Sequence, residues 1–419
     1  MAKIVLSTMG SLGDLHPMIA LGLELRARGH SVVINSWEGY AEKIGLLGFE
    51  FARLRPTIDP EDREFIKKAM DGREGSATVI REMVLPYLDK MYEDLKAACV
   101  GADAMVTGEL LYVAKSLHEL TGINWVTTTL SPLTLFSFYD PGIYPGAGFM
   151  EYLRPMPAVF HRAFFEIARL TIKGWFEPYK TFRRRLGLDP DHDPVFFDKF
   201  SEQLHLAMFS RAFAAPQPDW PPQTVQTGFC FYDGQEDDGK MPDGLQEFLD
   251  KGGTPIVFTL GSAAVMDARD FFDESAKAAA RLGRRAVLLF GRDNDPPKGL
   301  TKEIVGFEYA PFSRVFPRAA CVVHQGGVGT TGQVLRAGVP HLIMPYGHDQ
   351  LDNAMRCRRI GVAEVIRRER YTEDRASQLL TRILSNPEYA KNAAEKRAVI
   401  EKELGAKAAC DEIESVLIR

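Results

Sequence analysis

Long hydrophobic runs are missing from this sequence of 419 residues. A transmembrane helix needs about 20 consecutive apolar residues, and no stretch approaches that length. The apolar run that begins at Ile4 is also too short for the core of a signal peptide. From the sequence we therefore expect neither a membrane span nor a secretory leader.

Cysteine is scarce, and its positions are scattered. An odd number of cysteines without a C-x-x-C pair indicates neither a disulfide framework nor a thiolate zinc site. The histidines show no metal-ligand spacing, so we expect no bound metal. Free thiols suit a reducing compartment, which predicts a cytoplasmic protein. The five cysteines are Cys99, Cys230, Cys321, Cys357 and Cys410.

Positive charge does not predominate, because 51 Lys and Arg stand against 56 Asp and Glu and give a formal net charge of −5. Proteins that bind nucleic acid typically present a basic surface, so we expect no nucleic-acid partner. Any bound phosphate must then be held by local groups. Hydrophobic residues make up 45% of the chain and charged residues 26%, as in ordinary globular proteins, and the length suits two domains.

Short apolar strands alternate with segments of helical length in the first half of the chain. Lys3–Thr8 has the composition of a buried strand, Pro17–Arg28 has apolar residues at helical spacing, and Ser31–Asn35 returns to strand. This βαβ start predicts one doubly wound α/β domain over residues 1–215. Further strands are expected at Ala104–Thr107, Trp125–Thr128 and Leu204–Ala207.

A proline-rich stretch at 215–222 and a polar loop at 233–244 predict an interdomain linker over residues 216–244. The alternation then resumes and predicts a second doubly wound domain over 245–400. Two such domains can form a cleft at the carboxyl ends of their strands, where α/β proteins bind ligands. The strands expected in the second domain are Pro255–Leu260, Ala286–Phe290, Cys321–His324 and His341–Met344.

The most informative stretch runs from residue 321 to residue 353. Its glycines, Gly326, Gly327 and Gly329, let backbone N–H groups approach an anion closely, and Thr330 and Thr331 are expected to open a helix. The first N–H groups of a helix lack internal partners and carry partial positive charge. The stretch therefore predicts a diphosphate site that needs no strongly basic pocket.

Residues 327–332 also match G-x-G-x-x-G, and Asp349 lies about 20 residues further on, where a dinucleotide-binding protein places a ribose-binding acid. Two features favour a nucleotide sugar over NAD. The unit lies deep in the C-terminal half, and Asp349 is followed by Gln350, Asp352 and Asn353, a cluster that suits several sugar hydroxyls.

The same stretch resembles the donor-site signature of the family 1 nucleotide-sugar glycosyltransferases. It has a His at a strand end, a glycine-rich turn, a helix, Gly-Val-Pro, and then Asp-Gln with a following Asn. The form His-Gln-Gly-Gly-Val-Gly-Thr is most similar to the bacterial branch that includes rhamnosyltransferases and sterol glucosyltransferases.

The resemblance extends over nearly the whole chain. Met9–Met18 and Leu25–His30 resemble the opening loop and helix of that family, and Val225–Phe229 resembles its interdomain segment. The resemblance implies a GT-B fold, in which two Rossmann-like domains face a central cleft. It also implies that the last helix, near Glu401–Ile418 and within residues 401–419, crosses back to the first domain.

Two residues are candidates for accepting the proton of the acceptor hydroxyl, and a third is a candidate for supporting the base. Asp14 aligns with the base position of the family, although an Asp there could instead be a helix N-cap. His16 is the rival base, because its pKa suits the task better. In related enzymes an acid after the strand at 104–107 supports the base; here that position is Gly108, and Glu109 is the available substitute. Gly13, in the loop before Asp14, is assigned to the donor site.

Several groups could hold the donor diphosphate. Gly261 and Ser262 resemble the family's backbone and hydroxyl contacts, although Ser262 could equally cap a helix. Relatives often carry a second His after His324, where this chain has Gln325, so either Gln325 or His324 meets the phosphates. The loop and helix groups assigned to the phosphates are Gly326, Gly327, Gly329 and Thr330.

Other residues are assigned to the nucleoside and the sugar. Tyr309 and Ala310 resemble the base-binding loop of the family, with Tyr309 stacking on a pyrimidine, and Gln333 falls where relatives bind ribose. Asp349 and Gln350 would accept from and donate to sugar hydroxyls, the structural alternative being a loop cap.

Residues 136–182 contain thirteen aromatic residues. Aromatics at helical spacing usually pack in a core, but the loop at 141–148 has too many Gly and Pro for regular structure, so aromatics beside it could face a ligand. The basic run 183–185 is either a solvated helix face or a membrane-surface patch. The residues assigned to an apolar acceptor are Phe136, Phe138, Tyr139 and Tyr144.

The sequence thus predicts an inverting, metal-independent glycosyltransferase that moves a hexose or deoxyhexose from a UDP- or dTDP-sugar to a hydroxyl of an apolar acceptor. The nucleotide sugar is a co-substrate, and no further cofactor is expected. Two alternatives remain: a nucleotide-sugar epimerase of similar fold, and a non-catalytic protein that binds nucleotide sugar. The sequence does not choose the oligomeric state.

Overall fold

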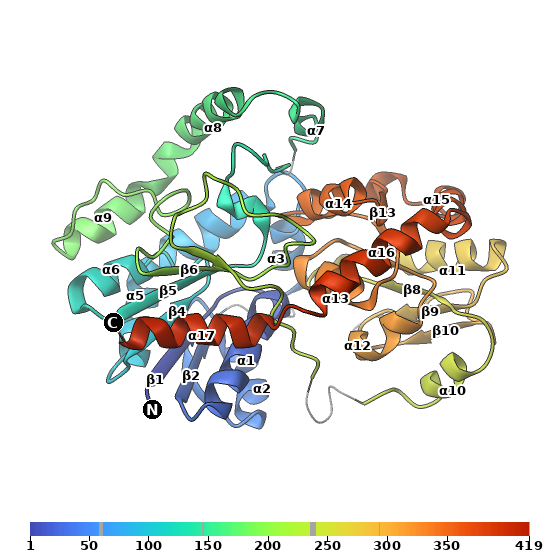
Figure 1. Ribbon diagram of the computed structural model, residues 1–419, viewed down its shortest axis with the longest axis horizontal. Coiled ribbons are helices and arrows are strands. Elements are labelled where there is room, and N and C mark those ends of the chain that lie inside the picture. Colours follow the sequence, from blue (N-terminus) through green and yellow to red (C-terminus); the bar gives the residue numbers. More distant parts are fainter. Residues whose placement is uncertain (58–61, 145, 235–239, 293, 419) are drawn as a thin grey trace.

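The computed structural model describes residues 1–418 except 58–61, 145, 235–239 and 293. Two parallel β-sheets, each covered by helices, form two neighbouring domains (Figure 1). This arrangement is the doubly wound α/β architecture predicted from the sequence. None of the helices in the described ranges is long and apolar enough to cross a membrane.

The first sheet has seven parallel strands in the order β3-β2-β1-β4-β5-β6-β7. The inner strand Lys3–Ser7 is buried on both faces, because helices cover the sheet on each side, and its Ile4, Val5 and Leu6 are completely shielded from solvent. The strands are β1 (Lys3–Ser7), β2 (Ser31–Ser36), β3 (Glu50–Arg53), β4 (Ala104–Thr107), β5 (Asn124–Thr129), β6 (Leu204–Ala207) and β7 (Thr224–Gln226).

Two strands of this sheet differ from the sequence expectation. β3 was not predicted, and β7 lies inside residues 216–244, which the sequence assigned to a linker. β7 pairs with β6, from His205↔Thr224 to Ala207↔Gln226, so the first sheet extends past residue 215. Both are edge strands without a fully buried residue, so neither has the apolar run by which buried strands are recognised.

The second sheet has six parallel strands in the order β10-β9-β8-β11-β12-β13. β10 and β13, again at the edges, were not predicted. The order reverses between β8 and β11, and the corresponding reversal in the first sheet lies between β1 and β4. The strands are β8 (Ile256–Thr259), β9 (Ala286–Leu289), β10 (Ile304–Phe307), β11 (Cys321–His324), β12 (His341–Ile343) and β13 (Ala363–Val365).

Helices fill the connections of both sheets. Those of the first domain are α1 (Leu12–Ala27), α2 (Ala41–Leu46), α3 (Arg63–Ala69), α4 (Gly75–Thr78), α5 (Leu88–Ala98), α6 (Ala114–Thr121), α7 (Met150–Leu153), α8 (Ala158–Ile172) and α9 (Glu177–Arg185). The later helices are α10 (Leu245–Asp250), α11 (Phe271–Arg281), α12 (Phe312–Val315), α13 (Val328–Ala337), α14 (Gln350–Arg359), α15 (Glu373–Ser385), α16 (Pro387–Ile400) and α17 (Gly405–Ile418).

The last helix, α17, lies on the first domain beside α1 (Figure 1). Arg28, at the end of α1, pairs with Asp411 at 2.6 Å and with Glu414 at 2.8 Å. A Cβ on Gly405 would lie 2.3 Å from the carbonyl oxygen of Phe229, so the chain crosses closely over the interdomain segment. The crossing back of the last helix is therefore as expected, although the helix begins at Gly405 and not near residue 401.

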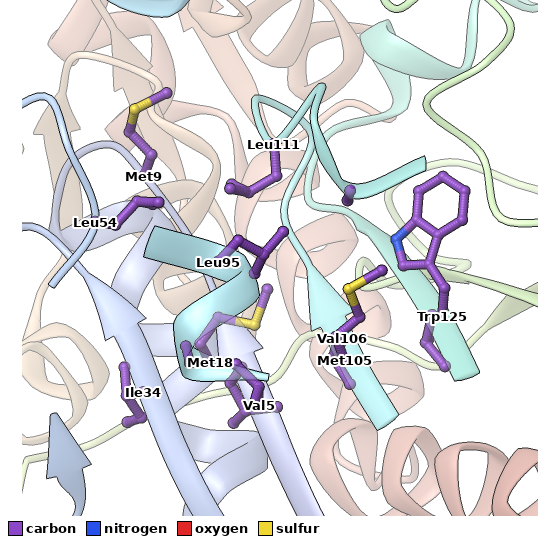
Figure 2. Packing of buried hydrophobic residues seen from close by; sticks show 14 of the residues in the cluster. Val5, Met9, Met18, Ile34, Leu54, Leu95, Met105, Val106, Leu111 and Trp125 are labelled. Atoms are coloured by element: carbon purple, nitrogen blue, oxygen red, sulfur yellow. The ribbon is translucent and has the colours of Figure 1, made fainter. Parts of the chain in front are cut away.

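The core of the first domain joins its sheet to its helices. In Figure 2, Met18 of α1 and Leu95 of α5 approach side chains of the central strands, including Val5 and Met105. Trp125 on β5 packs in the same cluster, and its Nε1 donates to Thr107 Oγ1 at 2.8 Å. This packing fixes β1 and β4, and the loops that follow these two strands carry the first group of candidate residues.

Candidate active site

A capping box starts α1 at the carboxyl end of β1. The N–H of Gly13 donates to Ser11 Oγ at 3.1 Å, and the N–H of Ser11 donates to Asp14 Oδ2 at 2.8 Å. Ser11 is therefore the N-cap, and Asp14 is the third helical residue, not the cap that the sequence offered as its structural alternative. A Cβ on Gly10 would lie 2.3 Å from Asp14 Oδ2, so the carboxylate folds back over a residue that has to be glycine.

Asp14 is a carboxyl group whose charged form is disfavoured. Burial is the main cause and outweighs the hydrogen bonds from Ser11, raising the pKa of Asp14 from 3.8 to about 7. The negative charges of Asp349 and Glu109 raise this pKa further. A carboxylate with a pKa near neutrality is a competent proton acceptor, which the ordinary capping role of Asp does not require.

His16 lies on a different side of α1. Its ring packs against Tyr232 of the interdomain segment, with ring centroids 5.1 Å apart. Residues two apart on an α-helix are rotated by about 200°, so His16 and Asp14 point to opposite sides. The structure therefore separates the two candidate bases, and the negative charge of Asp349 acts on Asp14.

Glu109 follows β4, and its polar partners lie within the first domain. The hydroxyls of Thr129 and Thr134 each donate to Glu109 Oε1 at 2.5 Å, and Lys199 Nζ lies 3.7 Å from the same oxygen. Lys199 is buried and also donates to the carbonyl of Thr134 at 2.7 Å. Glu109 thus holds the segment after β5 in place, and it influences Asp14 through its charge.

The glycine-rich loop leads directly from β11 into α13. The helix begins at Val328 with Gly327 as its N-cap, two residues earlier than the expected start at Thr330. The N–H of Thr331 already bonds to the carbonyl of Gly327 at 2.9 Å, so the N–H groups of Val328, Gly329 and Thr330 form the open end of the helix. A Cβ built on Gly329 meets no atom within 4 Å, so there is room for an anion there.

His324 is turned away from this opening. The N–H of Gly326 donates to His324 Nδ1 at 3.1 Å, so the proton of the neutral ring is on Nε2, which lies 2.9 Å from His341 Nδ1. His324 is completely buried, and burial lowers its pKa to about 3. The loop reaches this position because Gly326 has φ of +90°. His324 therefore stabilises the loop through its hydrogen bond with Gly326. Of the two candidates for contacting the phosphates, Gln325 remains.

Gln325 lies between the loops that follow β8 and β11. A Cβ on Gly261 would come 2.1 Å from Gln325 Nε2, and a Cβ on Gly327 would come 2.8 Å from the same atom. The side chain is buried, and its Oε1 has no hydrogen-bond partner among the described residues. Rotating the amide by 180° exchanges donor and acceptor, so this side chain can present an N–H to a phosphate oxygen. Both glycines are needed here for space.

Ser262 is exposed on the loop after β8. The short helical turn that follows, Ala264–Asp267, has Ala263 at its N-cap position and no side-chain capping bond within the described part of the chain. The capping alternative for Ser262 is therefore wrong, and its hydroxyl is available at the carboxyl end of the sheet.

Asp349 and Gln350, expected to act as a pair, differ in their surroundings. Asp349 occupies the N-cap position of α14 without making a capping bond in the described structure, and Asn353 Nδ2 donates to its Oδ2 at 2.8 Å. Burial raises the pKa of Asp349 to about 6. Gln350 Oε1 accepts from the N–H groups of Tyr346 at 2.9 Å and Gly347 at 3.4 Å. The oxygen of Gln350 therefore fixes the loop at residues 346–347. Its amide nitrogen is the part of the side chain that can donate a hydrogen bond to a sugar hydroxyl.

The proposed nucleobase loop follows β10. Tyr309 is 42% exposed and Ala310 is completely buried. The ring of Phe312 stacks on Phe316 with centroids 4.4 Å apart, and Phe312 is partly buried against a core cluster of this domain. Tyr309 is thus the solvent-exposed residue of the pair Tyr309 and Ala310.

Gln333, one turn into α13, is bound to the interdomain segment. Its Nε2 donates to Asp233 Oδ1 at 3.3 Å, and Arg336 pairs with the same carboxylate at 2.8 Å. Gln333 Oε1 is buried without a partner in the described residues. If Gln333 binds the ribose as expected, this oxygen would be the atom that accepts a hydrogen bond from a ribose hydroxyl.

Three of the four aromatics assigned to the acceptor gather in one cluster. Phe136 packs on Phe196 at 4.9 Å, on Phe165 at 5.5 Å and on Tyr144 at 6.3 Å, measured between ring centroids. Phe138 joins through Phe165 at 5.4 Å. Phe136 has φ of 52°, unusual for a bulky residue, and Lys199 lies over its ring at 5.0 Å. The cluster is continuous with the segment that Glu109 holds.

Two expectations about the surrounding surface change. Tyr139 is 61% exposed, which separates it from this cluster. The basic run at the end of α9 is paired internally, so the membrane-surface alternative loses its main support. Its ion pairs are Arg183 with Glu119, Arg184 with Glu177, and Arg185 with Asp89.

The structure also brings in residues that the sequence analysis missed or placed elsewhere. Asp352 and Asn353 were grouped with Asp349 as a site for sugar hydroxyls, but both are completely buried and bind protein groups. Arg356 and Ser131 were not considered. The spacing of Asp349, Asn353 and Arg356, at roughly one turn of helix each, could have indicated a common face. In the described residues no group of three or more His, Cys, Asp or Glu is arranged to hold a metal ion.

Comparisons with known proteins agree with the fold. The profile "Glycosyltransferase family 28 N-terminal domain" matches residues 4–139, and "Erythromycin biosynthesis protein CIII-like, C-terminal domain" matches residues 287–418. Solved structures with similar folds include the "Glycotransferase of kitacinnamycin" (TM-score 0.70, 22% identity, 99% of this chain and 98% of that chain). Another is "Spinosyn Rhamnosyltransferase SpnG complexed with thymidine diphosphate" (TM-score 0.68, 16% identity, 98% and 100%).

Among curated relatives, O-mycaminosyltylonolide 6-deoxyallosyltransferase of Streptomyces fradiae is 31% identical over 421 aligned positions, which cover 98% of this chain and 97% of the relative. Sterol 3-beta-glucosyltransferase of Candida albicans is 26% identical over 87% of this chain, which spans only 24% of that longer protein. With two domains of the GT-B fold, matches to both family profiles and a full-length relative at this identity, the chain belongs to the family 1 glycosyltransferases.

Proposed function

We propose that this glycosyltransferase moves a hexose or deoxyhexose, with inversion, from a UDP- or dTDP-sugar to a hydroxyl of an apolar natural product or sterol-like acceptor. The observation that carries the proposal is the open N-terminus of α13 after the glycine loop, which Asn353 joins to Asp349 through hydrogen bonds to Gly326 and Asp349. The negative charge of Asp349 in turn contributes to the raised pKa of Asp14 in the other domain. A proton acceptor from one domain then meets a sugar-binding carboxylate from the other.

In this mechanism Asp14 accepts the proton of the acceptor hydroxyl while that oxygen forms a bond to the anomeric carbon. The bond from this carbon to the departing diphosphate oxygen breaks on the opposite face of the sugar, so the configuration inverts. The proton ends on Asp14 and the negative charge ends on the diphosphate. A base with a pKa close to the working pH is suited to this transfer.

The departing charge would be met by the open N–H groups of Val328, Gly329 and Thr330, with Ser262 and Gln325 beside them. A helix N-terminus stabilises an anion through oriented donors and its dipole. These donors are fixed before the reaction, so they need little reorganisation as charge develops. The proposal therefore includes no metal.

Relatives support the choice of substrates. One structural neighbour is a rhamnosyltransferase complexed with thymidine diphosphate, and the full-length relative is a 6-deoxyallosyltransferase of O-mycaminosyltylonolide. Together with the sterol enzymes these names favour a deoxyhexose or glucose donor. The cluster around Phe136, Phe165 and Phe196 supports a hydrophobic acceptor, because aromatic faces bind flat or polycyclic apolar surfaces well.

A donor and acceptor screen tests the proposal. Purified protein is incubated with a panel of UDP- and dTDP-sugars and with phenolic, macrolide and sterol acceptors, and products are identified by mass and by the NMR coupling of the anomeric proton. We expect a glycoside of inverted configuration. Conversion of the donor to an epimer, or nucleotide binding with neither transfer nor hydrolysis across the panel, would contradict the proposal.

A further inference from the structure

Helix α14 carries a buried polar face at the boundary between the domains. Asp352 and Asn353 are completely shielded from solvent, and the Arg356 side chain is 3% exposed. Polar and charged groups are buried in this way only when their hydrogen bonds are satisfied. Their partners show which parts of the molecule this helix connects.

Asn353 joins three segments. Its Nδ2 donates to the carbonyl of Gly326 at 3.0 Å and to Asp349 Oδ2 at 2.8 Å, so the phosphate loop and the sugar-binding carboxylate share one amide. Its Oδ1 accepts from Ser131 Oγ of the first domain at 3.3 Å. One side chain therefore sets the orientation of Asp349 relative to both the phosphate loop and the other domain.

Ser131 lies in the segment that leads to the aromatic cluster. Three residues later, the hydroxyl of Thr134 lies within hydrogen-bond distance of both Glu109 Oε1 and the carbonyl of Ser131, the latter at 2.9 Å. Phe136 of the aromatic cluster is two residues further along the chain. A shift of Ser131 would therefore move the residues that we assign to the acceptor.

Arg356 makes a second connection, one turn along α14. Its Nε pairs with Asp352 Oδ2 at 2.6 Å, and its Nη1 bonds to Asp140 of the first domain. The other oxygen of Asp352 accepts from the N–H of Ile143 at 3.0 Å. Asp140 also pairs with Arg154 at 2.6 Å. The loop that bears Phe138 and Tyr144 is thus anchored on α14, which lies against the first domain in Figure 1.

We propose that α14 couples the two substrate sites, with Asn353 and Arg356 as positioning residues that hold the acceptor segments 131–136 and 138–144 in register with Asp349. This rests on the proposed function of Asp349 and of the aromatic cluster. Binding of the donor at the N-terminus of α14 orders the acceptor segments, and by linkage an ordered acceptor segment strengthens donor binding. In the absence of the acceptor-side contacts, water reaches the bound donor sugar.

The test uses two substitutions on the first domain that leave all donor groups intact. Asp140→Asn keeps the shape of the side chain but removes the charge that faces Arg356, and Ser131→Ala removes only the hydroxyl that donates to Asn353. Glu119→Gln is the matched control, because Glu119 pairs at 2.8 Å with Arg183, another arginine that is 1% exposed, but within one domain. All measurements use the full chain.

Two readouts separate coupling from a merely structural role. In the first, hydrogen exchange of residues 131–144 is followed with and without UDP or dTDP. We expect slower exchange with nucleotide in the unmodified chain and in Glu119→Gln, and loss of that protection in both first-domain variants. In the second, the ratio of donor hydrolysis to sugar transfer should rise by about fivefold or more in Asp140→Asn and Ser131→Ala, the lower end of typical coupling strengths.

Because linkage is reciprocal, the nucleotide Kd should rise in Asp140→Asn and Ser131→Ala, by up to about the same fivefold factor, and it should stay unchanged in Glu119→Gln. An unchanged hydrolysis ratio together with unchanged protection in the two variants would overturn the coupling, and so would equal effects in Glu119→Gln. If the unmodified chain hydrolyses and transfers no donor, the proposed function fails. The exchange experiment then decides the coupling by itself, because absence of nucleotide-dependent protection at 131–144 refutes it.

Discussion

The carboxyl groups of Asp14 and Asp349, one from each domain, lie close enough that the negative charge of Asp349 raises the pKa of Asp14. Each is also shifted mainly by its own burial, to about 7 for Asp14 and about 6 for Asp349. Two carboxylates that share a poorly solvated boundary do not both ionise readily. The protonation of the proposed base, Asp14, therefore depends on the charge of the proposed sugar ligand, Asp349.

Replacing Asp14 with Asn is expected to remove catalysis while keeping the helix start. The Asn oxygen can still accept from the N–H of Ser11, which lies 2.8 Å from Asp14 Oδ2, but it cannot take a proton. We expect kcat for an alcohol acceptor to fall by about 10²- to 10⁴-fold, with little change in nucleotide affinity by calorimetry. His16→Gln is the control, and we expect it to retain most of the rate. If His16→Gln abolishes transfer and Asp14→Asn does not, His16 is the base.

The raised pKa of Asp14 also makes a prediction about stability and pH. In the unfolded chain the group titrates near 3.8 and in the folded chain near 7, so the folded state binds the proton more tightly. Stability from this group is therefore complete below pH 3.8 and is lost as the pH rises through about 7. Urea unfolding between pH 5 and pH 8 should show a steeper loss of stability in the unmodified protein than in Asp14→Asn. Parallel curves for the two proteins would contradict this assignment.

The sequence predicted the buried parts of the fold well, because parallel strands covered on both faces are continuous apolar runs. β4 and β6 begin and end at the predicted residues, whereas the edge strands β3, β7, β10 and β13 were missed because edge strands have less buried side-chain surface. The glycine loop and the helix after it were also predicted, but the helix begins at Val328, two residues before the expected Thr330. Contacts such as Ser131 with Asn353 join residues 222 positions apart, and no local pattern indicates them.

Asp349→Ala is expected to affect the sugar more than the nucleotide. Its carboxylate is held by Asn353 beside the phosphate loop, and sugar hydroxyls left without this partner should cost about 1–3 kcal/mol of binding. Calorimetry with the nucleotide sugar and with the free nucleotide separates the two contributions. Equal losses for both ligands would show that Asp349 acts on the phosphate loop and does not recognise the sugar.

Chelation should leave transfer largely intact. The leaving diphosphate is assigned to the N–H groups at the start of α13 and to Gln325 and Ser262, which supply positive potential without a metal. Enzyme dialysed against EDTA is therefore expected to keep most of its rate. Loss of activity on chelation, followed by recovery with Mg²⁺ or Mn²⁺, would show that a metal stabilises the leaving group.

The contact between Gly261 and Gln325 predicts a mutation and its rescue. A Cβ at position 261 would lie 2.1 Å from Gln325 Nε2, so the end of the buried Gln325 side chain would have to shift. Gly261→Ala should lower stability by about 1–3 kcal/mol through overpacking and weaken donor binding, because it displaces the side chain assigned to the phosphates. Truncating Gln325 to Ala in the same protein removes the clash. The double variant should recover the melting temperature but not the donor affinity, because the amide is still missing. Recovery of both would mean that Gln325 only fills space, and recovery of neither would mean that Gly261 is required for its backbone and not for the room it leaves.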